Sequence, residues 1–240
     1  MLITKNFKLL YKQKGWNIWF SISTLEKGMW LKMNAIVLTN PIIQHKLSII
    51  RNKNTGTKEF REIIGEIATF LCYEAMSDAK LQTIEVETPM GTTKVKTLDE
   101  NQYAFVPILR AGTGMLDGLV KVMPNAKIGH VGLYRNEETL KPVRYYYKMP
   151  QDIANREVIV LDPMLATGGS AIDTITMLKE DGVKKIKFLC IIAAPEGILK
   201  LQEQHQDVQI YTAAVDEKLN DIGYIVPGLG DAGDRIFGTK

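Results

Sequence analysis

Apolar and polar residues follow different patterns in the early part of the chain. Across residues 57–72 the apolar side chains recur every three or four positions, which predicts an amphipathic helix with a single buried face. An Asn-Pro pair opens residues 40–51 and predicts a short helix with an N-cap and a proline in its first turn. Residues 83–97 alternate apolar and polar side chains around a proline and a glycine. This pattern predicts a hairpin or a pair of short strands, with Lys94 and Lys96 facing water.

Further along the chain the alternation gives way to continuous apolar runs, which are typical of strands buried on both faces. The runs cover residues 103–109, 127–134, 157–162 and 185–194. Segments of helical length lie between or after them, at residues 113–123, 170–181 and 195–205. This order predicts an α/β fold, a parallel sheet flanked by helices with a small hairpin element. In such folds ligands bind in the loops that follow the strands.

The composition is that of an ordinary globular domain, with 240 residues of which 45% are hydrophobic and 24% charged. No apolar run approaches the 18 residues of a membrane span. Cys72 and Cys190 lie far apart in apolar stretches, which indicates buried thiols in a reducing, cytoplasmic location. With three histidines and no cluster of Cys or His, a dedicated zinc site is not expected.

Residues 1–32 differ in composition from the rest of the chain. They hold six lysines against one acid, Glu26, and all three tryptophans, whereas the other 208 residues carry 24 basic and 26 acidic groups, a net charge of −2. The segment lacks the apolar core of a secretory signal. We therefore predict an N-terminal extension, followed by one domain over residues 33–240. The extension could be an organelle-targeting peptide, non-native upstream sequence or a poorly ordered tail.

The loop after the third apolar run carries the strongest chemical signal. The strand ends in Asp162, and a run of small residues leads into a helix at Ser170. Gly168 and Gly169 allow backbone N–H groups to converge, and the helix start adds a partial positive charge, so a phosphate group fits here. Asp162 is placed to accept hydrogen bonds from sugar hydroxyls. The alternative interpretation is an ordinary capped, glycine-rich turn.

Two other glycine-rich segments point to ligand contact. Arg110 follows a buried strand, and Gly112 and Gly114 come next, so a guanidinium and backbone amides could meet a diphosphate. The segment 223–238 contains five glycines and two aspartates, which indicates a close approach to its backbone. Residues 228–233 match G-x-G-x-x-G, but we expect no helix in the seven residues that follow and therefore no dinucleotide site.

The sequence DPMLATGGS, residues 162–170, resembles the loop of type I phosphoribosyltransferases that binds phosphoribosyl diphosphate (PRPP), in the version found in uracil phosphoribosyltransferases. Most of the superfamily has two adjacent acids at the start of this loop, whereas Pro163 takes the second position here. The resemblance covers residues 33–240 and implies a set of PRPP-binding residues. These are Arg110, Arg135, Asp162, Pro163, Met164, Leu165, Ala166, Thr167, Gly168, Gly169, Ser170 and Asp231. The implied uracil-binding residues are Ile225, Gly230, Asp231 and Ala232.

The resemblance further implies that uracil and PRPP react to give UMP and diphosphate, in UMP salvage. Arg110, Arg135 and Asp231 would be the catalytic residues, and Arg135 lies in a segment that resembles the mobile loop of the family. Mg²⁺ would be held mainly through PRPP oxygens, so we assign no protein ligand to it. Backbone groups would pair with the acceptor, donor and acceptor edge of uracil and reject cytosine. The family also implies a homo-oligomer, a dimer or larger, and GTP as a candidate activator.

Two alternatives keep the fold and change the function. One is a regulatory protein of the same superfamily that binds RNA, which the net charge of −2 on residues 33–240 argues against. For the same reason we interpret Tyr145, Tyr146 and Tyr147 as packing residues rather than as a platform for nucleic acid bases. The other alternative is a purine base in place of uracil. We expect neither nucleic acid nor a membrane as a partner.

Overall fold

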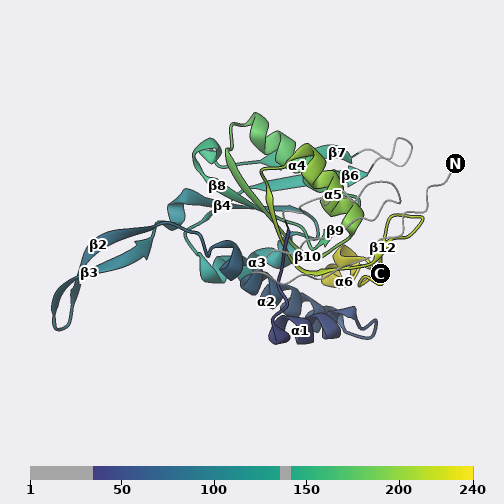
Figure 1. The fold of residues 1–240 in the computed structure, drawn as a ribbon, viewed down its shortest axis with the longest axis horizontal. Helices are drawn as coiled ribbons and strands as arrows, with labels where there is room; N and C mark the ends of the chain where they lie inside the picture. Colours follow the sequence, from purple (N-terminus) through teal and green to yellow (C-terminus); the bar gives the residue numbers. More distant parts are fainter. Residues whose placement is uncertain (1–34, 136–141, 240) are drawn as a thin grey trace, which may run out of the picture.

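The computed structural model describes residues 35–135 and 142–239, and its centre is a mainly parallel sheet (Figure 1). The strands of this sheet are β1 (Ala35–Val37), β4 (Tyr103–Leu109), β5 (Lys127–Ile128), β6 (His130–Arg135), β7 (Pro142–Lys148), β8 (Glu157–Leu161), β9 (Met164–Leu165), β10 (Lys185–Ala193) and β11 (Gln209–Val215). Their order is β1-β11-β10-β8-β4-β6-β7, with β5 beside β4 and β9 beside β10. Within the described residues all pairs of this sheet are parallel except β6 with β7. The predicted α/β fold is confirmed.

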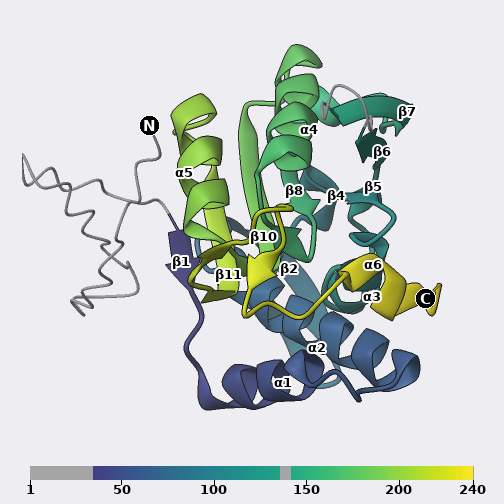
Figure 2. The ribbon, with the colours of Figure 1, turned by 90° about the vertical axis from the view of Figure 1, so that its right-hand side faces the viewer.

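Helices cover both faces of the sheet, as Figure 2 shows. They are α1 (Pro41–Arg51), α2 (Thr57–Ala75), α3 (Thr113–Val122), α4 (Gly169–Glu180), α5 (Pro195–Gln204) and the short α6 (Ala232–Phe237). The core beneath α1, α2 and α3 takes Phe105 and Ile159 from the strands, and the core beneath α4 and α5 takes their neighbours Val106 and Val160. Successive residues of one strand therefore enter opposite cores, which is why the strands read as continuous apolar runs.

A two-stranded hairpin projects from the body of the molecule (Figure 1). Its strands, β2 (Leu81–Thr88) and β3 (Gly91–Leu98), pair antiparallel, and the predicted hairpin is thus confirmed. Lys94 and Lys96 are exposed, as expected. The 3-10 turn η1 (Glu100–Gln102) leads from this hairpin into β4.

The structure also differs from the sequence prediction in several elements. The pattern gave no indication of β1 or of β11, the two strands at one side of the sheet. The predicted strand 127–134 is divided at Gly129, whose N–H donates to the Phe105 carbonyl while the chain passes from β5 to β6. β7 returns antiparallel to β6, so the sheet is mixed at that edge. The predicted extension over residues 1–32 lies outside the described residues.

Parallel strands place their carboxyl ends at one edge of the sheet, and the predicted ligand loops all follow such ends. Residues 109–114 begin at the last residue of β4, and residues 162–170 follow β8. After β11 the chain forms the small hairpin of β12 (Lys218–Leu219) and β13 (Ile225–Val226), and residues 225–232 begin with β13. Among the described residues, no helix is both long and apolar enough to cross a membrane.

Candidate functional site

The first loop of the site, residues 162–170, is the phosphate loop. β10 holds it in place, because the Pro163 carbonyl accepts a 2.9 Å hydrogen bond from the Ile191 N–H, and Met164 and Leu165 pair with β10 as β9. Gly168 is the N-cap of α4 with φ +79°, and no side chain caps this helix start. The first N–H groups of α4 are therefore left for a ligand, and the helix dipole favours an anion there.

Asp162 lies at the start of the phosphate loop, where its Oδ1 accepts a hydrogen bond from the Met164 N–H at 3.2 Å. Burial raises the pKa of this carboxyl to about 7, and the Met164 N–H opposes the shift only in part. A hydroxyl-bearing ligand would add donors that favour the charged carboxylate. Asp162 is therefore placed to lose its proton when a sugar binds.

We expect the free energy of unfolding of the unliganded protein to depend on the ionisation of the Asp162 carboxyl. Its pKa of about 7 in the folded state exceeds the value near 4 of an unfolded aspartate. Between pH 4 and pH 7 the folded state therefore binds more protons than the unfolded state, so the free energy of unfolding falls as pH rises through this range. Asp162→Asn should reduce this slope in urea unfolding series from pH 4 to pH 8, and Asp173, whose pKa burial also raises, accounts for part of what is left. An unchanged slope in the variant would contradict the assignment.

The second loop, residues 109–114, is the diphosphate loop. The side chain of Arg110 is 58% exposed, and its guanidinium lies 3.5 Å from Asp234 Oδ1 of α6. A Cβ on Gly112 would lie 2.3 Å from the Leu161 carbonyl oxygen, so only glycine lets this loop lie against the end of β8. The diphosphate loop therefore contacts both β8, the strand that leads into the phosphate loop, and helix α6.

The third loop, residues 225–232, is the base loop. Ile225 and Ala232 are buried in the core, so these two residues could offer a ligand only their backbone. Gly230 is exposed with φ +80°, and its N–H and C=O have no hydrogen-bond partner among the described residues. A free donor and a free acceptor at one exposed glycine suit a heterocyclic base that presents both.

Asp231 has a local role that the sequence did not indicate. It is the N-cap of α6, and its Oδ1 accepts a 2.9 Å hydrogen bond from the Asp234 N–H. The expectation of no helix after residues 228–233 is therefore wrong. The cap at Asp231 starts a six-residue helix, and Gly238 with φ +68° ends it. Within the described residues no βαβ unit follows this glycine pattern, which argues against a dinucleotide site of that type.

Arg135 and the three consecutive tyrosines lie on the neighbouring strands β6 and β7. Arg135 ends β6, and its side chain and residues 136–141 lie outside the described part of the structure. The packing prediction is confirmed for Tyr147, which packs against the core beneath α4 and α5 while its hydroxyl donates to Asp181 Oδ2 at 2.6 Å. Tyr145 packs over Gly132, but it and Tyr146 remain exposed on β7.

The sequence did not indicate the residues that hold the base loop from behind. Asp216 accepts hydrogen bonds from Arg51 and from the Gly228 N–H, and Arg235 donates to the Leu229 carbonyl oxygen at 2.7 Å. Asp216 follows β11, which the apolar pattern did not reveal. A signal was nevertheless present, because an aspartate directly after a strand is typical of this edge of an α/β sheet.

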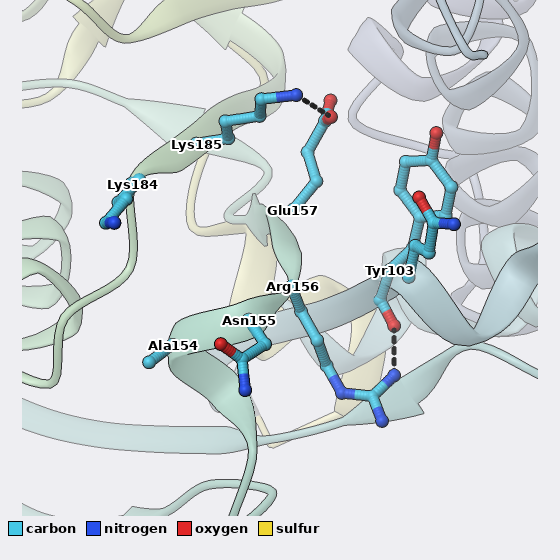
Figure 3. Close-up of a pocket in the computed structure, with 8 residues that line it drawn as sticks. Tyr103, Ala154, Asn155, Arg156, Glu157, Lys184 and Lys185 are labelled. Carbon is cyan, nitrogen blue, oxygen red and sulfur yellow. Dashed lines mark hydrogen bonds and ion pairs between the residues drawn. The ribbon is translucent and has the colours of Figure 1, made fainter.

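A separate cavity of about 290 Å³ lies at the opposite edge of the sheet (Figure 3). It lies beside the 3-10 turn η2 (Ile153–Asn155) and the first residues of β4, β8 and β10. Arg156 forms a two-pronged ion pair with Asp152 there, and Lys185 pairs with Glu157. These charged side chains thus pair with one another, and the cavity is remote from the three loops.

The three loops together offer anion-binding amides, a guanidinium and an open backbone edge. No three His, Cys, Asp or Glu side chains gather as a metal site within residues 35–135 and 142–239. The chain also matches, over residues 37–239, the profile of the family described as uracil phosphoribosyltransferase. The chain belongs to this family. The resemblance seen in residues 162–170 is thereby confirmed.

Individual relatives agree with the uracil phosphoribosyltransferase family. A uracil phosphoribosyltransferase of Lysinibacillus sphaericus is 61% identical over 204 residues, which are 85% of this chain and 98% of that protein. One of Dictyoglomus thermophilum is 61% identical over 206 residues, 86% of this chain and all of that protein.

Solved structures agree on the fold. The structure of an Aquifex aeolicus protein matches with a TM-score of 0.81 and 42% identity, over 86% of this chain and 99% of that one. Adenine phosphoribosyltransferase of Trypanosoma brucei matches with a TM-score of 0.54 over 80% of this chain and 87% of that one. At 12% identity the latter likeness shows the shared fold alone.

Proposed function

We propose that the protein transfers the phosphoribosyl group of PRPP to N1 of uracil and forms UMP and diphosphate, a step of UMP salvage. The observation that carries the proposal is the meeting of the three loops. Gly112 of the diphosphate loop lies against the strand that enters the phosphate loop, and Arg110 lies against α6 at the end of the base loop. One substrate that carries both a phosphate and a diphosphate could span the first two loops while a base occupies the third.

Each loop has a defined task in this reaction. The uncapped start of α4 would hold the 5′-phosphate, and Asp162 would accept hydrogen bonds from the ribose hydroxyls. The bond from the anomeric carbon to diphosphate breaks with its electron pair on the diphosphate, whose growing charge Arg110 and Arg135 would stabilise. Gly230 would aim N1 of uracil at the anomeric carbon through its free backbone groups. N1 forms the new bond to that carbon and gives up its proton to the departing diphosphate or to water. Asp231 would face the ribose. Positioning and electrostatics supply the rate.

Mg²⁺ belongs to the proposal as an ion that PRPP carries. Asp162 and Asp231 are the carboxylates of the proposed loops, and the pKa of Asp162, raised by burial, weakens it as a metal ligand near neutral pH. Oxygens of PRPP and water are therefore the fitting ligands, as is usual for Mg²⁺ at phosphates. When bound, the ion would neutralise charge on the diphosphate.

UMP formation from uracil and PRPP with Mg²⁺ tests the proposal directly. Cytosine, xanthine and hypoxanthine should give no nucleotide under conditions in which uracil is converted completely. Faster conversion of a purine would replace uracil as the substrate. No conversion of any base by folded protein would overturn the proposed activity, and binding of RNA would then be measured.

The proposal includes an oligomeric state and an activator. We infer a homo-oligomer because the projecting hairpin exposes Leu81, Ile84 and Met90, apolar side chains that a second copy could cover. Light scattering coupled to gel filtration should give a mass of two chains or more, and a monomer at assay concentrations would contradict this. We also propose GTP as an activator, which should raise the rate of UMP formation when added to the same assay.

A cytoplasmic location is the last part of the proposal. Cys72 and Cys190 are free and buried, and burial raises the pKa of each thiol to about 12. Such thiols are unreactive and form no disulfide framework, which suits a reducing compartment.

A further inference from the structure

Arg51 and Asp216 form an ion pair behind the base loop, here called the clamp. Arg51 donates to both carboxylate oxygens of Asp216, at 2.8 Å and 2.5 Å, so the pair is two-pronged. The Asp216 side chain is only 4% exposed. The two residues come from distant parts of the chain, the last residue of α1 and the first residue after β11.

The clamp engages both backbone polar groups of one residue of the base loop, Gly228. Asp216 Oδ2 accepts from the Gly228 N–H at 2.8 Å, and Arg51 donates to the Gly228 carbonyl oxygen at 2.9 Å. Gly228 has φ +65°, and a Cβ there would lie 2.2 Å from the Ile225 carbonyl oxygen. The backbone at this point is therefore fixed in direction as well as in position.

At the next residue, Leu229, the carbonyl group is held by a second arginine. Arg235 donates to the Leu229 carbonyl oxygen and also to the Ile50 and Asn52 carbonyl oxygens at the end of α1. Gly230 follows, and its N–H and C=O are without partners in the described part of the chain. Both backbone groups of Gly228 and the carbonyl group of Leu229 are thus engaged, and the N–H and C=O of Gly230 are left for a ligand.

We propose that the Arg51–Asp216 clamp is a positioning device for base recognition, which fixes Gly228 so that the free backbone groups of Gly230 face the base. This inference rests on the proposed transfer to uracil. The clamp does not touch the phosphate or diphosphate loops in any contact described above. Its loss should therefore weaken base binding and selectivity and leave PRPP binding largely unchanged.

Arg51→Lys and Asp216→Asn test the clamp. Lysine keeps the positive charge but loses the planar fork that engages two acceptors, and asparagine removes the charge while keeping the shape. We expect the KM for uracil to rise at least tenfold in both variants. The dissociation constants of PRPP and ribose 5-phosphate should change less than twofold. The ratio of UMP to CMP affinity should fall, because a loosened backbone discriminates less between the two bases.

Asp152→Asn is the matched control. It removes the charge from the two-pronged Arg156–Asp152 pair, in which the Arg156 side chain is buried. Arg156 lies at the opposite edge of the sheet (Figure 3). A comparable change in melting temperature without a change in uracil KM is expected of it. The Arg51→Lys/Asp216→Asn double variant should resemble the single variants, because the two residues act as one unit.

The outcomes separate this inference from the proposed function. Normal UMP formation by the wild type, with uracil KM unchanged in both variants, would overturn the clamp alone. Equal losses of uracil and ribose 5-phosphate affinity would also overturn it, because they would mark a general structural role. Absence of UMP formation by the wild type would overturn the proposed function and the clamp's role together.

Discussion

Arg110→Ala should lower kcat/KM for UMP formation at least 100-fold while the protein remains as stable as the wild type. The side chain is 58% exposed, and the one ion pair that it forms within residues 35–135 and 142–239, with Asp234, is long at 3.5 Å. Exposed pairs of this kind contribute about 0–1 kcal/mol to stability. A guanidinium that binds the departing diphosphate contributes more, because the charge on that group grows in the transition state. A 100-fold loss corresponds to about 2.7 kcal/mol.

The size of the loss should depend on geometry as well as on charge. Arg110→Lys keeps the charge and loses the forked donor arrangement, so its kcat/KM should lie between those of the wild type and Arg110→Ala. Inhibition by diphosphate should weaken in the same order, since diphosphate is the group that Arg110 is proposed to bind. Binding of ribose 5-phosphate, which lacks the diphosphate, should not change.

Lys185→Ala is a suitable control for Arg110→Ala. Lys185 is also an exposed cation in one long ion pair, 69% exposed and 3.9 Å from Glu157, but it lies at the opposite edge of the sheet (Figure 3). Its removal should leave kcat/KM within twofold of the wild type. If Arg110→Ala behaves like this control, Arg110 has no part in the reaction.

The sequence predicted the parts of the fold in which one physical pattern dominates. The central strand β4 was predicted with both its ends because side chains on both of its faces are buried. Helix α2 was predicted because one of its faces is buried. β1 has only three residues, and in the edge strand β7 the charged side chains of Arg144 and Lys148 interrupt the apolar ones, so neither strand gives a continuous apolar run. Short or edge strands form because neighbours are available to pair with, which local sequence does not encode.

The candidate site likewise has a part that the sequence predicts and a part that it does not. The phosphate loop could be predicted because its chemistry lies in nine consecutive residues. The clamp could not, because Arg51 and Asp216 are 165 residues apart and meet only after β11 has joined the sheet. Uracil binding at Gly230 stays a prediction. The distant contacts engage the carbonyl groups of Gly228 and Leu229, and that of Gly230 has no partner among the described residues.

Gly168→Val should lower the affinity for PRPP and for ribose 5-phosphate at least 100-fold. Gly168 has φ +79°, a conformation that a β-branched residue rarely adopts. A Cβ there would lie 3.1 Å from the Gly197 carbonyl oxygen of α5. Gly197 in turn lies against the phosphate loop, because a Cβ on it would lie 2.3 Å from the Ala166 carbonyl oxygen. The phosphate loop must therefore shift, and the amides at the start of α4 lose the arrangement that a phosphate requires.

Strain alone would also destabilise the protein, so the control must carry the same strain elsewhere. Gly182 lies just beyond the other end of α4 with φ +87°, and a Cβ there would lie 3.3 Å from Ala154 Cβ. Gly182→Val should cost a similar amount of stability, about 1–3 kcal/mol for a residue forced into this region. Calorimetric titration with ribose 5-phosphate at a temperature where both variants are folded separates the two effects. Equal affinity in the two variants would show that the start of α4 does not hold the phosphate.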